Sequence, residues 1–315
     1  MLSRSSRKTV MESGTAVLIG TTFFAAFVNG ALGYGFSSLT VPVALLFYAN
    51  RILNPALVLI EIFVNLYVLI INRASIPTVW KRFYPIILSL LPGVVVGSYM
   101  VASIHPGWMK FVTYSFILPL ILIQAAGIRR PIRSERLMGV PVGTGLGLLY
   151  SMTTISGPPI AVLFNNQGLV KRDFRAGLAL IRVAESTLTA IAYYQLGLFA
   201  AGSLHMIRII TPGILIGIPL GVYTIRHVDA ETFRRICMSF DSWIVGFGLS
   251  RILLELGLVQ GLTAYEPLML AVLVDSYLFY GFFKTRRRNT VSIKASSALE
   301  FTARFSSQPR RDGSG

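Results

Sequence analysis

The chain has 315 residues, of which 54% are hydrophobic and only 13% are charged. Soluble globular proteins carry about 25% charged residues, so this composition argues against an ordinary soluble domain and excludes intrinsic disorder for most of the length. The 29 Lys and Arg residues outnumber the 13 Asp and Glu residues, for a net charge of +16. Beside apolar spans, such an excess is typical of cytoplasmic membrane loops and indicates no nucleic acid partner. The sequence therefore predicts an all-α polytopic membrane protein.

Nine apolar stretches are candidate membrane spans, since a helix needs about 20 residues to cross a hydrocarbon core about 30 Å thick. In chain order they lie at about residues 13–33, 54–72, 84–103, 108–127, 137–150, 176–198, 206–225, 235–256 and 264–283. A basic segment at 1–12 precedes the first of them, and the basic, Ser-rich residues 284–315 follow the last. We expect that tail to be disordered and to lie on the cytoplasmic side of a plasma (bacterial inner) membrane.

Two apolar stretches, 13–48 and 137–164, are too long for one crossing and too short for two. A helix of about 35 residues is about 50 Å long, and both stretches are interrupted by Gly, Ser and Pro. Each is therefore predicted to contain a broken or re-entrant helix. If 137–164 folds back, the basic loop 129–136 and the basic residues at 171–175 share one side of the membrane, as the positive-inside tendency favours.

The sequence also contains an internal repeat. Four short words recur in the same order at offsets of 117 to 124 residues, among them Pro42–Phe47 with Pro159–Phe164 and Pro92–Gly97 with Pro212–Gly217. This nearly constant offset indicates a duplication, with membrane repeats at 13–128 and 137–258 and an unrepeated helix at 259–283. Duplicated halves with a broken helix at the matching place are typical of secondary transporters.

Both breaks place small and hydroxyl-bearing residues just before a proline that can begin a half-helix. We predict substrate contacts by Asn29, Gly33, Gly35, Ser37 and Ser38 in the first break, and by Thr153, Thr154, Ser156 and Gly157 in the second. The free N–H groups and the positive dipole end of a half-helix would suit an anion. The alternative is close packing, because small residues let transmembrane helices approach one another in any bundle.

Charged residues within the spans point to the same region, because a charge at the membrane centre is costly unless it is paired or hydrated. Arg182 and Glu185 lie three residues apart on one helix face, and Glu61 falls opposite Arg182 in the repeat alignment. We predict that Arg182 binds an anionic substrate and that Glu61 or Glu185 carries a coupling proton. The alternative is a structural ion pair of Arg182 with Glu61 or with Glu185.

The remaining charges within the spans give weaker signals. Arg251 and Glu255 lie four residues apart near a helix end, where a local pair or snorkelling to the interface is expected. Asp241 fits either a cavity wall or a hydrogen bond between helices. Asp275 lies on the unrepeated last helix.

Taken together, these motifs resemble the sulfite exporter TauE/SafE family of bacterial-type membrane permeases. The resemblance rests on Gly33–Pro42 (GYGFSSLTVP), Ser156–Pro159 (SGPP), Phe174–Ala176 (FRA) and the two Pro-Gly-x-x-x-Gly words, and it covers about residues 30–255. It implies transport of small anions, notably sulfite, sulfonates and related organosulfur compounds. Phe36-Ser37-Ser38 and Gly177 depart from the family pattern, which bears on the substrate more than on the fold.

The sequence shows no motif of an enzyme. It has no HExxH motif, no Ser/His arrangement within a span and no cofactor loop, so we expect neither catalysis nor a cofactor or metal site. Its single cysteine, Cys237, excludes an internal disulfide. The prediction is a small-anion permease that works by alternating access, with proton coupling as a further expectation. A passive anion channel, an intramembrane enzyme and a scaffold are the alternatives.

Overall fold

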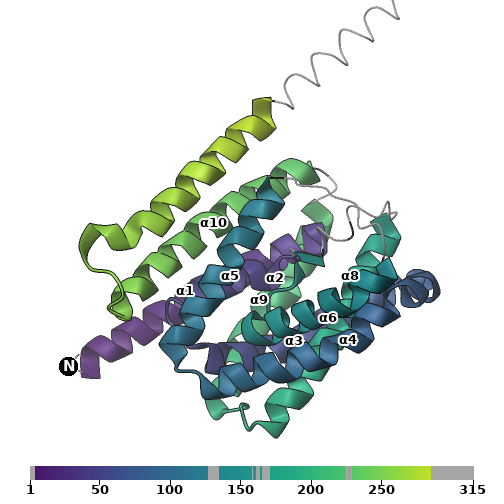
Figure 1. The fold of residues 1–315 in the computed structure, drawn as a ribbon, viewed down its shortest axis with the longest axis horizontal. Helices are drawn as coiled ribbons and strands as arrows, with labels where there is room; N and C mark the ends of the chain where they lie inside the picture. The colour runs from purple at the N-terminus through teal and green to yellow at the C-terminus, as the bar shows by residue number, and fades with distance from the viewer. Residues whose placement is uncertain are drawn as a thin grey trace, which may run out of the picture.

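The computed structural model describes residues 4–126, 135–157, 159–160, 164, 171–224, 227 and 229–284. Regular structure in these residues is entirely helical (Figure 1). The helices are α1 (Arg4–Leu32), α2 (Phe36–Ala44), α3 (Asn50–Ile71), α4 (Ile76–Ser103), α5 (Pro106–Ala125), α6 (Glu135–Thr153), α8 (Lys171–Gln195), α9 (Ala201–Thr224) and α10 (Ala230–Glu255). A final helical segment, Gly261–Lys284, follows. The predicted disordered tail lies outside the described residues from residue 285 on.

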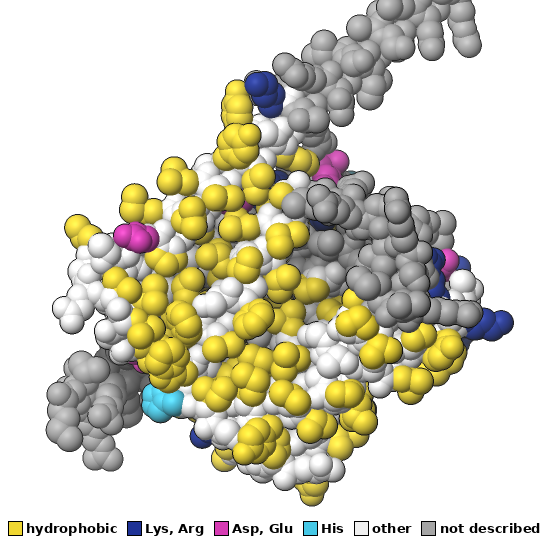
Figure 2. All heavy atoms as spheres, in the orientation of Figure 1, with side chains coloured by type: hydrophobic (Ala, Val, Ile, Leu, Met, Phe, Trp, Pro, Cys, Tyr) yellow, Lys and Arg dark blue, Asp and Glu magenta, His cyan; other side chains and the backbone are white. Residues whose placement is uncertain are grey.

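Eight helices in the described part of the chain are long and apolar enough to cross a membrane. They coincide with eight of the predicted spans, and the ninth corresponds to α6, which has 19 residues. Large apolar side chains such as Phe63, Leu88 and Leu215 are exposed along them, and Figure 2 shows hydrophobic side chains spread over the face in view. An apolar exterior of this extent suits lipid, so the prediction of an all-α polytopic membrane protein is confirmed.

Glycines bring two pairs of helices into backbone contact. On α4, a Cβ added to Gly93 would lie only 1.9 Å from the Thr144 carbonyl oxygen of α6. On α9, a Cβ added to Gly221 would lie 1.9 Å from the Phe27 carbonyl oxygen of α1. Each of these pairs joins one helix from residues 13–128 to one helix from residues 137–258. The repeat itself and the boundaries drawn from it remain predictions.

Both long apolar stretches return to the end of the bundle from which they start. A Cβ at Gly14 would lie 3.3 Å from Phe47 Cβ, so the chain comes back to the start of α1 after α2. A Cβ at Gly139 on α6 would lie 3.3 Å from Pro85 Cβ, and one at Gly177 on α8 would lie 2.7 Å from Phe83 Cε2. Since both contacts are with one turn of α4, α6 and α8 begin at the same end, as a fold-back between them requires.

Candidate functional site

The first break lies between α1 and α2 and depends on two glycines with positive φ. Gly33 has a φ of 83° and Gly35, the N-cap of α2, has a φ of 108°. Glycine adopts these angles without the steric cost that a Cβ would add. The chain therefore turns sharply at residues 33–35, and α2 begins inside the bundle with every one of its residues buried. The N–H groups of its first turn have no acceptor within the helix.

The second break follows α6 at Thr153. Thr154 has a φ of 57°, which is uncommon for a residue other than glycine. Both threonine hydroxyls serve the local backbone: Thr153 Oγ1 donates to Leu149 O at 2.7 Å and accepts from the N–H of Ile155 at 3.0 Å, and Thr154 Oγ1 donates to Thr153 O at 2.7 Å. These two residues shape the break and their hydroxyls are already engaged.

Two side chains from the central helices α3 and α8 hold the end of α6 in place. Asn54 Nδ2 on α3 donates to the Met152 carbonyl at 2.7 Å, and the Tyr193 hydroxyl on α8 donates to the Ser151 carbonyl. Asn54 and Tyr193 are fully buried. The carbonyls freed where α6 stops are thus bonded within the bundle, as backbone groups at membrane depth must be.

The residues after each break meet charged side chains from α3 and α8. Arg182 on α8 forms a buried ion pair with Glu61 on α3, and Ser37, at the start of α2, donates to the same carboxylate oxygen. Ser156, after the second break, donates to Glu185 Oε2 on α8. We call the following residues the central cluster: Ser37, Glu61, Tyr150, Ser156, Arg182, Glu185 and Ser186. All are at most 2% exposed.

The central cluster holds two carboxylates and one guanidinium. With Glu61 and Glu185 both ionised and Arg182 positive, its formal charge is −1, which would repel an anion. Glu185 Oε1 and Arg182 Nε have no hydrogen-bond partner among the described residues. Buried polar atoms are rarely left unpaired, and a buried charge without a partner is costly. These two atoms therefore mark a place where a ligand or a proton would be stabilised.

Tyr150 and Ser186 connect Glu61 on α3 to α6 and α8. The Tyr150 hydroxyl donates to Glu61 Oε2 at 2.7 Å, and Ser186 Oγ donates to the Arg182 carbonyl at 2.6 Å. The Tyr150 hydroxyl oxygen lies 2.8 Å from Ser186 Oγ, within hydrogen-bond distance. Glu61 is therefore linked to α6 directly and to α8 through Tyr150 as well as through Arg182.

The structure brings together only part of the predicted site. Gly157 belongs with the cluster, because a Cβ there would lie 3.9 Å from Arg182 Nη1. Ser38 instead donates to the Gly35 carbonyl at 3.2 Å. Gly33 faces Arg175, whose side chain would lie 3.5 Å from a Cβ at residue 33. Asn29 is buried in α1, and its Oδ1 has no partner among the described residues.

Sequence reasoning assigned no role to Tyr150, Asn54 or Tyr193. An aromatic or amide residue inside an apolar span carries no signal that separates packing from a hydrogen-bonding role. The local Arg182–Glu185 pair, one of the two structural alternatives, is not the ion pair formed, since Arg182 pairs with Glu61 on another helix.

The other charges within the spans have separate places. Asp275 on the final segment pairs with Arg235 of α10 at 2.8 Å, with both side chains buried. Asp241 is buried at a small cavity beside Ser38 and Gln124. Among the described residues, no group of three or more His, Cys, Asp or Glu side chains is placed to hold a metal ion.

A family model described as "Sulfite exporter TauE/SafE" matches residues 18–246. The matched range runs from α1 into α10 and contains both breaks and every residue of the central cluster. The comparisons with curated proteins and with solved structures gave no match.

Proposed function

We propose, from the premise that the chain belongs to the sulfite exporter TauE/SafE family, that its central cluster binds a small oxyanion together with protons. Membership of this family makes the chain a membrane transporter of the sulfur-anion type, and its eight apolar helices fit an integral multi-pass protein. The finer proposal is that the substrate is sulfite, a sulfonate or a related organosulfur anion. Transport proceeds by alternating access around the two breaks.

The charge of the central cluster is the observation that carries this proposal. Arg182 is the positively charged residue of the cluster that could bind an anion, and in this structure it is paired with the Glu61 carboxylate. An anion can replace Glu61 only if the carboxylate loses its charge, because two anions around one buried cation leave an uncompensated negative charge. With protons on Glu61 and Glu185, the cluster has a formal charge of +1 and matches a monovalent anion. Binding of the anion is then linked to binding of protons.

The break geometry supports the same assignment. Ser37 in the first turn of α2 and Ser156 directly after α6 reach Glu61 and Glu185, so both breaks face one cluster. Serine hydroxyls and free N–H groups at the start of a half-helix are suitable donors for an oxyanion. When Glu61 and Glu185 are protonated, these donors become available to the substrate.

The test is flux through the purified protein in liposomes. We expect saturable sulfite and methanesulfonate transport that shows counterflow and that an inward proton gradient accelerates. Arg182→Gln should lose transport, while Arg208→Gln, an exposed arginine on α9, should keep it. Transport by Arg182→Gln with unchanged affinity would remove Arg182 from the site. Flux that ignores the proton gradient would contradict coupling, and conductance without saturation would indicate a channel.

A further inference from the structure

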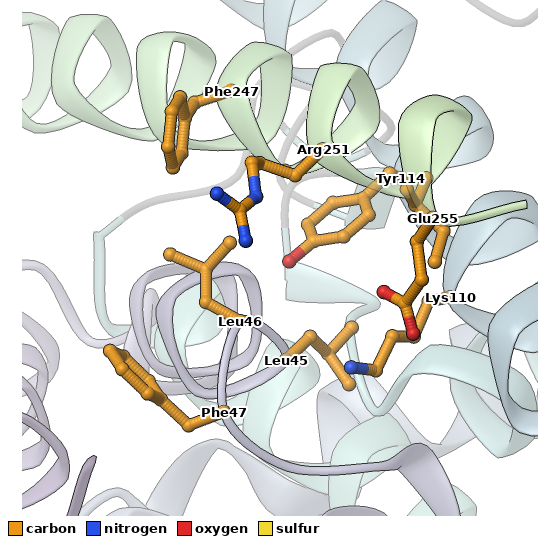
Figure 3. Close-up of a pocket in the computed structure, with 10 residues that line it drawn as sticks. Leu45, Leu46, Phe47, Lys110, Tyr114, Phe247, Arg251 and Glu255 are labelled. Atoms are coloured by element: carbon orange, nitrogen blue, oxygen red, sulfur yellow. The ribbon is translucent and has the colours of Figure 1, made fainter. Parts of the chain in front are cut away.

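A charged cavity lies at the other end of α2, away from the central cluster. It has a volume of about 230 Å³ and is bounded by Leu45, Leu46 and Phe47 after α2, by α5, and by the last turns of α10. Figure 3 shows the side chains of Lys110, Tyr114, Arg251 and Glu255 pointing into the same space. Pockets for drug-sized ligands measure about 300–1,000 Å³, so this one suits a small ligand.

The three charges around the cavity are not paired with one another. The local pair expected between Arg251 and Glu255 does not form, and none of Lys110, Arg251 and Glu255 has an ion-pair partner within 4.0 Å among the described residues, although Lys110 and Glu255 lie near enough to attract each other. Two positive side chains and one negative one give the cavity a net charge of +1. In Figure 3, Lys110 and Glu255 lie on one side of the space and the Arg251 guanidinium lies on the other.

The wall behind these charges is fixed. The Tyr114 hydroxyl donates to the Pro42 carbonyl of α2 at 2.8 Å. Gly248 of α10 leaves room for the tyrosine ring, since a Cβ there would lie 2.3 Å from Tyr114 Cζ. Tyr114 is buried, whereas Arg251 and Glu255 are exposed. The cavity therefore has a packed wall at Tyr114 and opens at the surface of the bundle.

We propose that this cavity is a peripheral binding site for a monovalent oxyanion. A guanidinium offers two parallel N–H donors that match the oxygens of a sulfonate or phosphate, and Lys110 adds a point charge from the opposite side. The net charge of +1 balances a singly charged anion, whereas a divalent anion would leave the pocket negative beside Glu255. A sulfonate or hydrogensulfite meets this requirement, and so does the phosphodiester of an anionic lipid. The site does not depend on the function proposed for the central cluster.

The test is calorimetric binding to the full chain in a neutral detergent, with methanesulfonate as the monovalent probe and sulfate as the divalent one. We expect wild-type protein to prefer methanesulfonate. Arg251→Gln should weaken methanesulfonate binding at the peripheral cavity at least tenfold, and Arg208→Gln should not. Glu255→Gln raises the charge of the pocket to +2 and should shift the preference towards sulfate, which a purely structural role of Glu255 would not do.

Two further arms separate this site from the central cluster and from lipid. Ser37→Ala alters the central cluster and leaves the peripheral cavity intact. Methanesulfonate binding at the peripheral cavity should therefore persist in Ser37→Ala and be lost in Arg251→Gln. Phosphatidylglycerol is then added as a competitor of methanesulfonate. If it displaces methanesulfonate from wild-type protein but not from Arg251→Gln, a lipid headgroup binds in the same site. If it does not displace methanesulfonate, the site binds free anions. The proposal is overturned if Arg251→Gln binds methanesulfonate, sulfate and lipid as the wild-type protein does. It is also overturned if Arg208→Gln loses as much methanesulfonate affinity as Arg251→Gln does.

Discussion

Glu61 contacts side chains of the candidate site from three other helices. Its carboxylate accepts from Ser37 on α2, contacts Tyr150 on α6 and pairs with Arg182 on α8. One ionisable group thus touches three other helices, two of which end or begin at a break. A substitution of Glu61 therefore alters the contacts of all three helices at once.

Glu61→Gln separates the proton from the rest of this network. Glutamine cannot ionise, and its Nε2 can donate to Tyr150 as a protonated glutamate would. In wild-type protein we expect methanesulfonate affinity to fall as pH rises, if anion binding is linked to protonation of the carboxylates as proposed above. In Glu61→Gln the affinity should fall less steeply and should exceed the wild-type value at the alkaline end. Calorimetry over a pH series measures both.

A matched control is Glu231→Gln, which alters an exposed glutamate on α10. It should keep the wild-type pH dependence. If Glu61→Gln shows the wild-type pH dependence too, Glu61 is not a proton carrier and its contact with Arg182 is structural.

At the residue scale, the charged part of the site was predictable and its connections were not. Glu61 and Arg182 stood out because ionisable groups inside a span are costly and because the repeat alignment placed them opposite each other. Tyr150 did not stand out, since its role depends on the geometry that brings α6 beside α3. Asn29 was predicted from its neighbours in sequence, yet its Oδ1 has no hydrogen-bond partner among the described residues.

At the scale of elements, glycine spacing determines how α4 and α6 meet. Gly147 on α6 faces the Leu90 carbonyl of α4, where a Cβ would lie only 2.2 Å from the oxygen. Gly145, two residues earlier, points away from α4, and a Cβ there would meet nothing within 4 Å. The helix thus has one side that requires glycine and one side that does not.

Gly147→Ala and Gly145→Ala form a matched pair on one helix. Gly147→Ala should lower stability by about 1–3 kcal/mol, because the added methyl group forces the two backbones apart. Gly145→Ala should be neutral or should stabilise by up to about 1 kcal/mol, through the better helix propensity of alanine. Thermal unfolding in detergent tests this, and equal effects of the two substitutions would show that the close contact does not limit packing.

Helix positions were predictable from apolar length, but their ends were not. The structure begins α4 at Ile76 where the sequence indicated about 84, and α10 at Ala230 where it indicated about 235. These extra turns carry Lys81, Arg82 and Arg234. Long basic side chains can stay on a helix and reach the membrane surface, so the helix continues beyond the apolar core that hydropathy detects.

At the scale of the whole molecule, the basic helix starts gather at one end. α4 and α8 begin together, since Phe83 packs against Gly177. Arg175 near the start of α8 reaches the Ala31 carbonyl beside the first break at 3.3 Å, and Arg234 near the start of α10 lines a small cavity with Tyr34 of the same break. The positive-inside tendency favours the cytoplasm for this end.

Cysteine labelling tests this orientation in intact cells. In a Cys237→Ser background, Leu262→Cys lies in the turn after α10, at the opposite end, and Leu262 is 88% exposed. A membrane-impermeant maleimide should label Leu262→Cys from outside. Arg73→Cys, in the turn before α4, should react only after permeabilisation. The reverse pattern would invert the orientation.

The glycine contacts also decide which parts of the protein can move as rigid bodies. α1 touches α9, and α4 touches α6, backbone against backbone at several of these glycines. We therefore expect each pair to move as a unit, and each contains one helix from either half of the sequence. On this expectation the two sequence halves do not rock against each other as separate blocks. We expect the change of access proposed for transport to occur between the two pairs, where α3 meets α8 and the Glu61–Arg182 ion pair joins those two helices.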